Sequence, residues 1–164
     1  MALRIIVLKA KIKNSYLGSE FMKKTQADLK NEIKIFFEKY IKTIEKKDFN
    51  ALSSMYAKKR NMLFIGTDIN EWLLGWPTVE KSLAVFLKTV TKIKYSCSKF
   101  NVNFSADKSV AWIAYIANIN VTIGKEKNFL DSIRTTIVLE NIDGGWLITH
   151  THSSMPVMGQ AVEY

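Results

Sequence analysis

Residues 93–104 read IKYSCSKFNVNF, and the pattern in this stretch decides the fold class. Its first half places an apolar side chain at every second position, as in a strand with one buried face. From Phe100 to Phe104 the alternation continues in the opposite phase. A change of phase inside one strand predicts a β-bulge, which bends the strand and helps a sheet to curl. The stretch therefore predicts a long, bent strand.

Three further strands are predicted after this one, over residues 110–123, 133–140 and 146–154. The sequence Asp143-Gly144-Gly145 joins the last two, because Asp-Gly favours a tight hairpin turn. Several of these strands are apolar on both faces. One face must then meet helices, and the other lines an interior cavity or a subunit interface.

Helical spacing dominates the part of the chain before residue 93. We predict helices over residues 26–47, 49–58 and 77–91, with a strand over 61–67 between the second and the third. The apolar side chains of the first helix recur every three or four residues and are Leu29, Ile33, Phe36, Tyr40 and Ile44. Helices followed by a strand meander predict an α+β fold, with three N-terminal helices packed on a strongly bent antiparallel sheet.

The 164-residue chain is long enough for one domain, and its net charge of +9 is unevenly distributed. Residues 1–24 carry a net charge of +5, residues 25–60 carry +4, and residues 61–164 carry none. A basic excess raises the question of nucleic acid as a partner. A solvated, lysine-rich helix face explains the second part better, so we do not expect nucleic-acid binding.

The charge and the helical pattern also predict the domain boundaries. We expect a basic N-terminal appendage at residues 1–24, one domain at 25–158 and a C-terminal tail at 159–164. Helical patterning begins only after Thr25, and Met22 is followed by two lysines, so we expect the native domain to begin near Met22. The alternative is a short strand or helix that packs on the domain edge.

The single cysteine, Cys97, excludes an internal disulfide framework and fits a reducing compartment. No apolar run approaches the ~18 residues of a membrane span. The first residues briefly resemble a signal peptide, but Lys9 and Lys11 interrupt the apolar stretch and no small-residue cleavage site follows. We therefore expect a cytoplasmic protein that does not bind membranes.

The predicted closing strand reads WLITHTHSS from Trp146 to Ser154. Together with Arg134-Thr135-Thr136 and the segment Gly66–Gly75, it resembles the SnoaL-like branch of the nuclear-transport-factor-2-like superfamily. It is especially similar to bacterial relatives of the calcium/calmodulin-dependent kinase II association domain. The resemblance covers residues 26–158. It implies a cone-shaped α+β barrel of the cystatin-like type, with a pocket at the wide end and pairing through the outer sheet face.

The resemblance implies two alternative functions, because members of this superfamily differ widely in activity. The first is a small-molecule-binding domain, with cofactor-free isomerase, cyclase or dehydratase chemistry by proton transfer. The second is a non-catalytic assembly module. Expected partners are a small organic ligand, with or without an acidic group, and a second copy of the chain, forming a homodimer. We expect no metal and no cofactor, since the sequence has no phosphate loop, paired cysteine motif or Ser-His-Asp signature.

Two histidines are candidate site residues. His150 and His152 are two positions apart in a strand, so we expect both on the face shared by Trp146 and Ile148. His150 is a candidate general base near neutral pH, and His152 a candidate ligand-binding residue. The alternatives are a metal site, which needs a third ligand such as Asp68, and plain packing at the sheet face or dimer interface.

Two charged residues are further candidates. Arg134, in a strand otherwise made of apolar residues and threonines, either anchors an anion inside the pocket, pairs with Asp131 or Glu140, or faces solvent. Asp68 follows the strand at 61–67. It is either a general base whose pKa is raised by burial, or a residue that caps a turn.

Aromatic side chains are expected to line the pocket, because small-molecule sites are mostly apolar with a few polar groups. We predict this role for Phe64, Trp72, Trp76 and Tyr115. For Trp112 a core or interface position is the better prediction.

Overall fold

The first helix of the computed structural model, which describes residues 24–157 and 159, is α2 (Gln26–Glu45). A capping box fixes its start. The Thr25 hydroxyl accepts from the Asp28 backbone N–H at 3.2 Å, and the Asp28 carboxylate accepts from the Thr25 N–H at 3.0 Å. The appendage predicted at residues 1–24 lies outside the described residues except for Lys24, as does most of the tail predicted at 159–164.

The next segment is more broken than its sequence pattern predicts. α3 (Phe49–Ser54) is shorter than the predicted helix, and the predicted strand is reduced to β1 (Leu63–Ile65). A second short strand, β2 (Trp72–Leu74), pairs with β1. α4 (Trp76–Thr89) follows Gly75, whose φ of +81° is a conformation that favours glycine.

Four long strands form most of the sheet: β3 (Val90–Phe104), β4 (Val110–Ile123), β5 (Glu126–Ile142) and β6 (Gly145–Ser154). The strand order is β2-β1-β6-β5-β4-β3. β1 runs parallel to β6, and the other pairs are antiparallel, so the sheet is mixed rather than wholly antiparallel. β1 and β6 are far apart in the chain, so no hairpin turn forces them to run in opposite directions.

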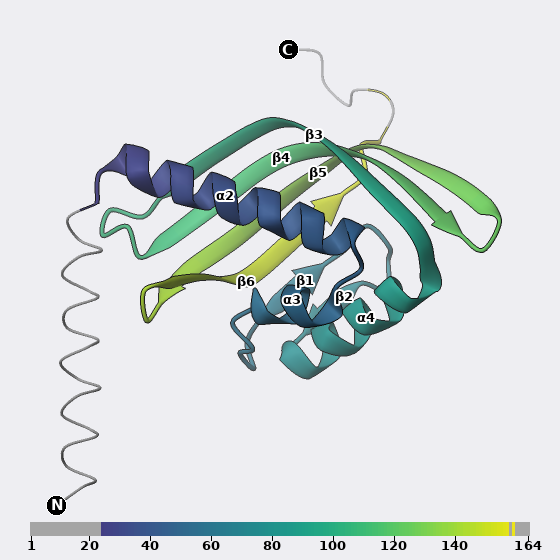
Figure 1. Ribbon diagram of the computed structural model, residues 1–164, viewed down its shortest axis with the longest axis horizontal. Helices are drawn as coiled ribbons and strands as arrows, with labels where there is room; N and C mark the ends of the chain where they lie inside the picture. Colours follow the sequence, from purple (N-terminus) through teal and green to yellow (C-terminus); the bar gives the residue numbers. More distant parts are fainter. Residues whose placement is uncertain (1–23, 158, 160–164) are drawn as a thin grey trace, which may run out of the picture.

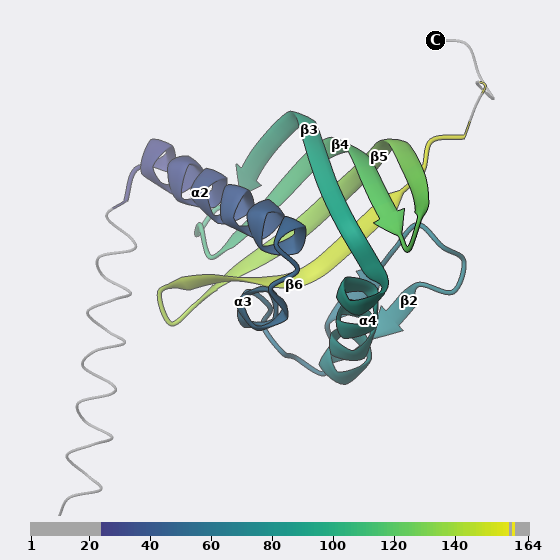
Figure 2. The same ribbon diagram turned by 45° about the vertical axis from the view of Figure 1, so that its right-hand side comes forward.

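Breaks in register bend this sheet. The predicted bulge in β3 is confirmed, because the register shifts between Ser98 and Asn101. A further shift occurs between β5 and β6, where Val138 and Leu139 are consecutive but their partners are His150 and Ile148. Figure 1 shows the sheet curving around α2, and Figure 2 shows α3 and α4 at one end of the curve. The predicted α+β cone of helices on a bent sheet is confirmed, and the sheet is not closed into a barrel.

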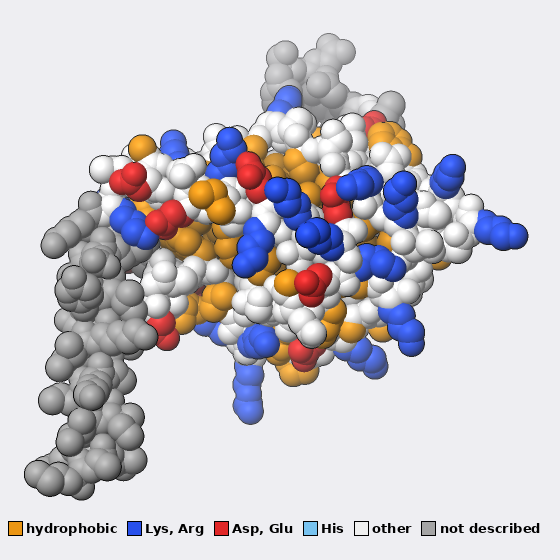
Figure 3. Space-filling model, in the orientation of Figure 1, with side chains coloured by type: hydrophobic (Ala, Val, Ile, Leu, Met, Phe, Trp, Pro, Cys, Tyr) orange, Lys and Arg blue, Asp and Glu red, His pale blue; other side chains and the backbone are white. Residues whose placement is uncertain are grey.

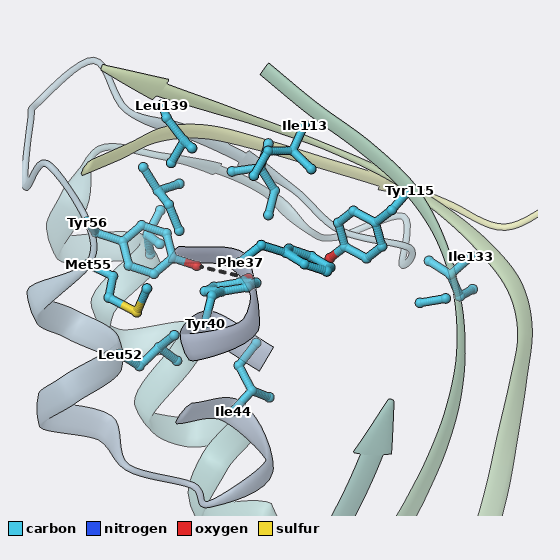
Figure 4. Close-up of a cluster of buried hydrophobic side chains, with 14 of the residues drawn as sticks. Phe37, Tyr40, Ile44, Leu52, Met55, Tyr56, Ile113, Tyr115, Ile133 and Leu139 are labelled. Carbon is cyan, nitrogen blue, oxygen red and sulfur yellow. Dashed lines mark hydrogen bonds between the residues drawn. The ribbon is translucent and has the colours of Figure 1, made fainter. Parts of the chain in front are cut away.

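The hydrophobic core lies between the helices and the inner, concave face of the sheet (Figure 4). Leu29 and Ile33 of α2 and Ile113 and Ile137 of the sheet are fully buried. Phe37 of α2, rather than the predicted Phe36, is buried, and its ring meets that of Tyr115 edge-on with 4.7 Å between the ring centroids. This packing fixes α2 over the concave face of the sheet.

On the face drawn in Figure 3, lysines and arginines are dispersed among Asp and Glu side chains. Among the residues that the structure describes, no helix combines the length and the apolar character needed to cross a membrane.

Candidate functional site

A cavity of about 170 Å³ lies inside the cone, between the helices and the inner face of the sheet. Most of its wall is apolar. The apolar lining includes Ile44, Leu52, Leu83, Ile93, Val121 and Ile133. A cavity of this size and character suits one ring of an organic molecule, since a dry apolar cavity of about 150 Å³ binds benzene in another protein.

A row of hydroxyl groups crosses the cavity wall. Tyr115 of β4 lies opposite Thr135 of β5, which in turn lies opposite Ser153 of β6. The Thr135 and Ser153 hydroxyls are hydrogen-bonded at 3.0 Å. All three residues line the cavity, so the row places polar groups on an otherwise apolar surface.

Glu71 continues this row toward β1. Gly66, which follows β1, is one position beyond the β1–β6 pair Ile65–His152, and this places it beside Ser153. A Cβ on Gly66 would lie 1.9 Å from Glu71 Oε2, so the glycine leaves the space that the carboxylate occupies. The carboxylate also accepts from the Asp68 backbone N–H at 3.1 Å. Gly66 and Glu71 both line the cavity.

Three tyrosines, Tyr40, Tyr95 and Tyr115, also line the cavity. Burial is the largest cause that raises the pKa of Tyr40, Tyr56, Tyr95 and Tyr115 above the ordinary value. The hydroxyls of Tyr40 and Tyr56 lie 3.5 Å apart, as the dashed line in Figure 4 shows. The phenols are protonated at neutral pH, so their hydroxyls can donate hydrogen bonds.

Comparison with known proteins places this fold in a family. The family model of the SnoaL-like domain matches residues 33–158. The chain belongs to the SnoaL-like domain family. A comparison with curated protein sequences gives no match.

Solved structures share the fold of this SnoaL-like domain. A nuclear transport factor 2-like superfamily protein from Salmonella enterica is 18% identical with a TM-score of 0.73, over 85% of this chain and 100% of that one. A candidate calcium/calmodulin-dependent protein kinase II association domain from Xanthomonas campestris is 23% identical with a TM-score of 0.66, over 78% of this chain and 88% of that one. A candidate dehydratase from Streptomyces avermitilis is 18% identical with a TM-score of 0.69, over 77% and 95%. At these identities the likeness concerns the fold alone.

The structure separates the aromatic residues predicted for the pocket. Phe64 of β1 and Tyr115 of β4 line the cavity. Trp72 does not, because it lies on the edge strand β2 and is 67% exposed. Trp76 is buried in the core instead, with its ring centroid 5.5 Å from that of Tyr56.

The expectation that His150 and His152 share a face with Trp146 and Ile148 is wrong. Thr149 is an extra residue at the register shift between β5 and β6, so the side chains after it point to the opposite face from those before it. Both histidines therefore lie on the outer face. His150 Nδ1 is 2.9 Å from the Leu63 backbone oxygen, and because a carbonyl only accepts, Nδ1 carries the proton.

Arg134 and Asp68 also lie away from the cavity. Arg134 is on the outer face with His152, in an open hollow of about 460 Å³, and its guanidinium donates to the Met155 backbone oxygen at 3.3 Å. Asp68 is exposed in the loop before β2, where its carboxylate accepts from the Asn70 N–H at 3.3 Å, so it acts as a turn residue. In the part of the chain that the structure describes, no three His, Cys, Asp or Glu side chains gather as metal ligands.

Sequence reasoning missed Glu71 and the hydroxyls of Thr135 and Ser153. Glu71 is the only carboxylate among the described residues that line the cavity. The sequence signal for it is Gly66, because a glycine at the end of a short strand often marks a close approach by another group. No sequence signal distinguishes the two hydroxyls from those of the neighbouring Thr136 and Ser154, which lie on the outer face.

Proposed function

We propose that this SnoaL-like domain binds a small organic molecule in its cone and catalyses a proton transfer on it, with Glu71 as the general base. The reaction class is that of a cofactor-free isomerase, cyclase or dehydratase. A dehydratase among the proteins of similar fold supports this class. The observation that carries the proposal is the carboxylate of Glu71, which packs on Gly66 at the wall of an apolar cavity.

The chemistry follows from this placement. A carboxylate at an apolar wall can remove a proton from a carbon next to a carbonyl group, and the electron pair then moves onto the carbonyl oxygen. Return of the proton to another carbon restores the carbonyl group and completes an isomerisation. In a dehydration the protonated Glu71 instead donates the proton to a hydroxyl group on the β-carbon, which leaves as water while the carbonyl group re-forms. Neither outcome requires an oxidant or a reductant.

Exchange of carbon-bound protons tests this role directly. Cyclohexanone incubated with the protein in D₂O should exchange its α-protons faster than in buffer, as followed by NMR. Glu71→Gln should lower the protein-dependent rate by about 10²–10⁴-fold, the usual contribution of a general base. Asp68→Asn is the matched control, because Asp68 lies in the same loop but outside the cavity. Equal rates in the wild type and Glu71→Gln would exclude Glu71 as the base.

A second candidate function, homodimeric assembly, is favoured by the outer face of the sheet. Trp112 is 39% exposed there, and Ala114 and Ile116 follow on the same face of β4. Exposed aromatic and apolar groups on one sheet face favour pairing with a second copy. Sedimentation should give a dimer for the wild type and a monomer for Trp112→Asp, whereas a monomeric wild type would exclude this function.

A further inference from the structure

One buried polar group of the cavity wall has no partner. Thr151 of β6 is 2% exposed and lines the cavity. Its hydroxyl oxygen is buried and makes no hydrogen bond to any residue that the structure describes. Buried polar atoms are almost always hydrogen-bonded, because an unpaired hydroxyl costs free energy. A bound ligand atom would satisfy this group.

The neighbours of Thr151 place more hydroxyls in the same part of the cavity. Ser153 lies two residues along β6, on the same face of the sheet, and its hydroxyl is bonded to that of Thr135. A rotation of about 120° around the Cα–Cβ bond of Thr151 can place its hydroxyl where its methyl group now lies. A ligand oxygen beside β6 therefore finds two hydroxyl groups that can each donate or accept.

The charge of the wall limits which ligands fit. No Lys, Arg or His is among the described residues that line the cavity, and its one ionisable carboxylate is that of Glu71. An anionic ligand would lose its hydration without gaining a cationic partner, and Glu71 would repel it. Arg134 lies on the opposite face of the sheet.

We infer that the cavity takes an uncharged ring carrying a carbonyl or hydroxyl oxygen, and that the hydroxyls of Thr151 and Ser153 bind this oxygen. This inference rests on the proposed binding of a small molecule in the cone and names the class of that molecule. Of the two kinds of ligand expected from the sequence, with and without an acidic group, it selects the second. A larger ligand can place one such ring inside the cavity and the remainder outside its mouth.

Three ring compounds of nearly equal size test the inference: p-cresol, p-xylene and p-toluate. Their dissociation constants can be measured at pH 7 by NMR titration. p-Cresol should bind roughly threefold to tenfold more tightly than p-xylene, the effect of one net hydrogen bond. p-Toluate should bind at least tenfold more weakly than p-cresol, because the wall offers no cation.

Variants locate the effect at the two hydroxyls. Thr151→Val and Ser153→Ala should each reduce the advantage of p-cresol over p-xylene, while the affinity for p-xylene stays within twofold. Ser154→Ala is the matched control, because the neighbouring Ser154 lies on the outer face. If Thr151→Val fails to fold, Ser153→Ala carries the test alone.

The binding results distinguish failure of this inference from failure of the proposed function. Equal affinities for p-cresol and p-xylene, tight binding of p-toluate, or a p-cresol advantage that survives the variants would overturn the inference and leave small-molecule binding intact. Failure of p-xylene itself to bind would instead contradict the proposed function, since that compound tests only the apolar cavity.

Discussion

Replacing Gly66 with alanine should abolish proton transfer in the cavity without unfolding the protein. The added Cβ would lie 1.9 Å from Glu71 Oε2 and 2.5 Å from its carboxyl carbon, so the carboxylate has to move. Its displacement breaks the 3.1 Å hydrogen bond from the Asp68 N–H. We estimate a cost of about 1–2 kcal/mol for the lost bond and the crowding, offset by roughly 0.4–1 kcal/mol from the stiffer unfolded chain.

The net loss of stability should therefore be close to 1 kcal/mol, a fall in Tm of about 2–4 °C for a domain of this size. The fall in proton exchange should be far larger. We expect Gly66→Ala to approach the rate of Glu71→Gln, because a base must lie within hydrogen-bonding distance of the proton that it removes. Circular dichroism melting and α-proton exchange of cyclohexanone measure the two effects on the same samples.

A double-mutant cycle separates this steric effect from general damage. Glu71→Ala removes the carboxyl group, so adding Gly66→Ala to that variant should cost at least about 0.5 kcal/mol less than in the wild type. The remaining contact, 2.8 Å to Cβ of residue 71, is present in both backgrounds, so its cost cancels in the cycle. Additive stability changes, or full exchange activity in Gly66→Ala, would refute the idea that Gly66 exists to hold Glu71.

Three other predictions concern the scaffold. Thr25→Ala should lower the free energy of unfolding by about 1 kcal/mol in urea titrations, because it removes the hydroxyl that caps α2; no change in the urea midpoint would exclude the cap. Ile113→Ala should cost about 2–5 kcal/mol by the same measurement, since Ile113 is fully buried, and a cost under 1 kcal/mol would contradict its place in the core. Hydrogen bonds from Ser105 and then Ser109 lower the pKa of Asp107 from 3.8 to about 2. Its stabilising effect should be complete above pH 4 and lost as the pH falls toward 2, and an NMR titration midpoint near 3.8 would contradict this.

The bend of the sheet is predictable from sequence where a bulge changes the pattern of residue types. In β3 the apolar positions change phase, and the register shift between Ser98 and Asn101 appears there. In β6 the extra residue, Thr149, leaves no such trace, because histidines continue the spacing that Trp146 and Ile148 begin. Alternation alone cannot show that those positions have changed face.

The acid of the candidate site was missed for a different reason. Asp68 follows the predicted strand directly, and Glu71 lies in what looks like an irregular segment before Trp72. The pairing of β2 with β1 decides which carboxylate faces the cavity. Each of these strands has only three residues, too few to give a periodic pattern in the sequence. The glycine at position 66, where a Cβ would collide with Glu71, is the one local sign that the chain folds back here.

The position of β6 has a consequence for the order of assembly. Among the described strands β6 comes last in the chain, yet it lies between β1 and β5 and alone joins β1 and β2 to the rest of the described sheet. A nascent chain that has emerged as far as Ile142 therefore holds two separate sheet fragments and no complete cavity wall. Ser153 and Thr151 then arrive together with the strand that closes the gap, so ligand binding can begin only in the final step of folding. A small molecule present during synthesis should accordingly stabilise the finished domain without hastening the steps before it.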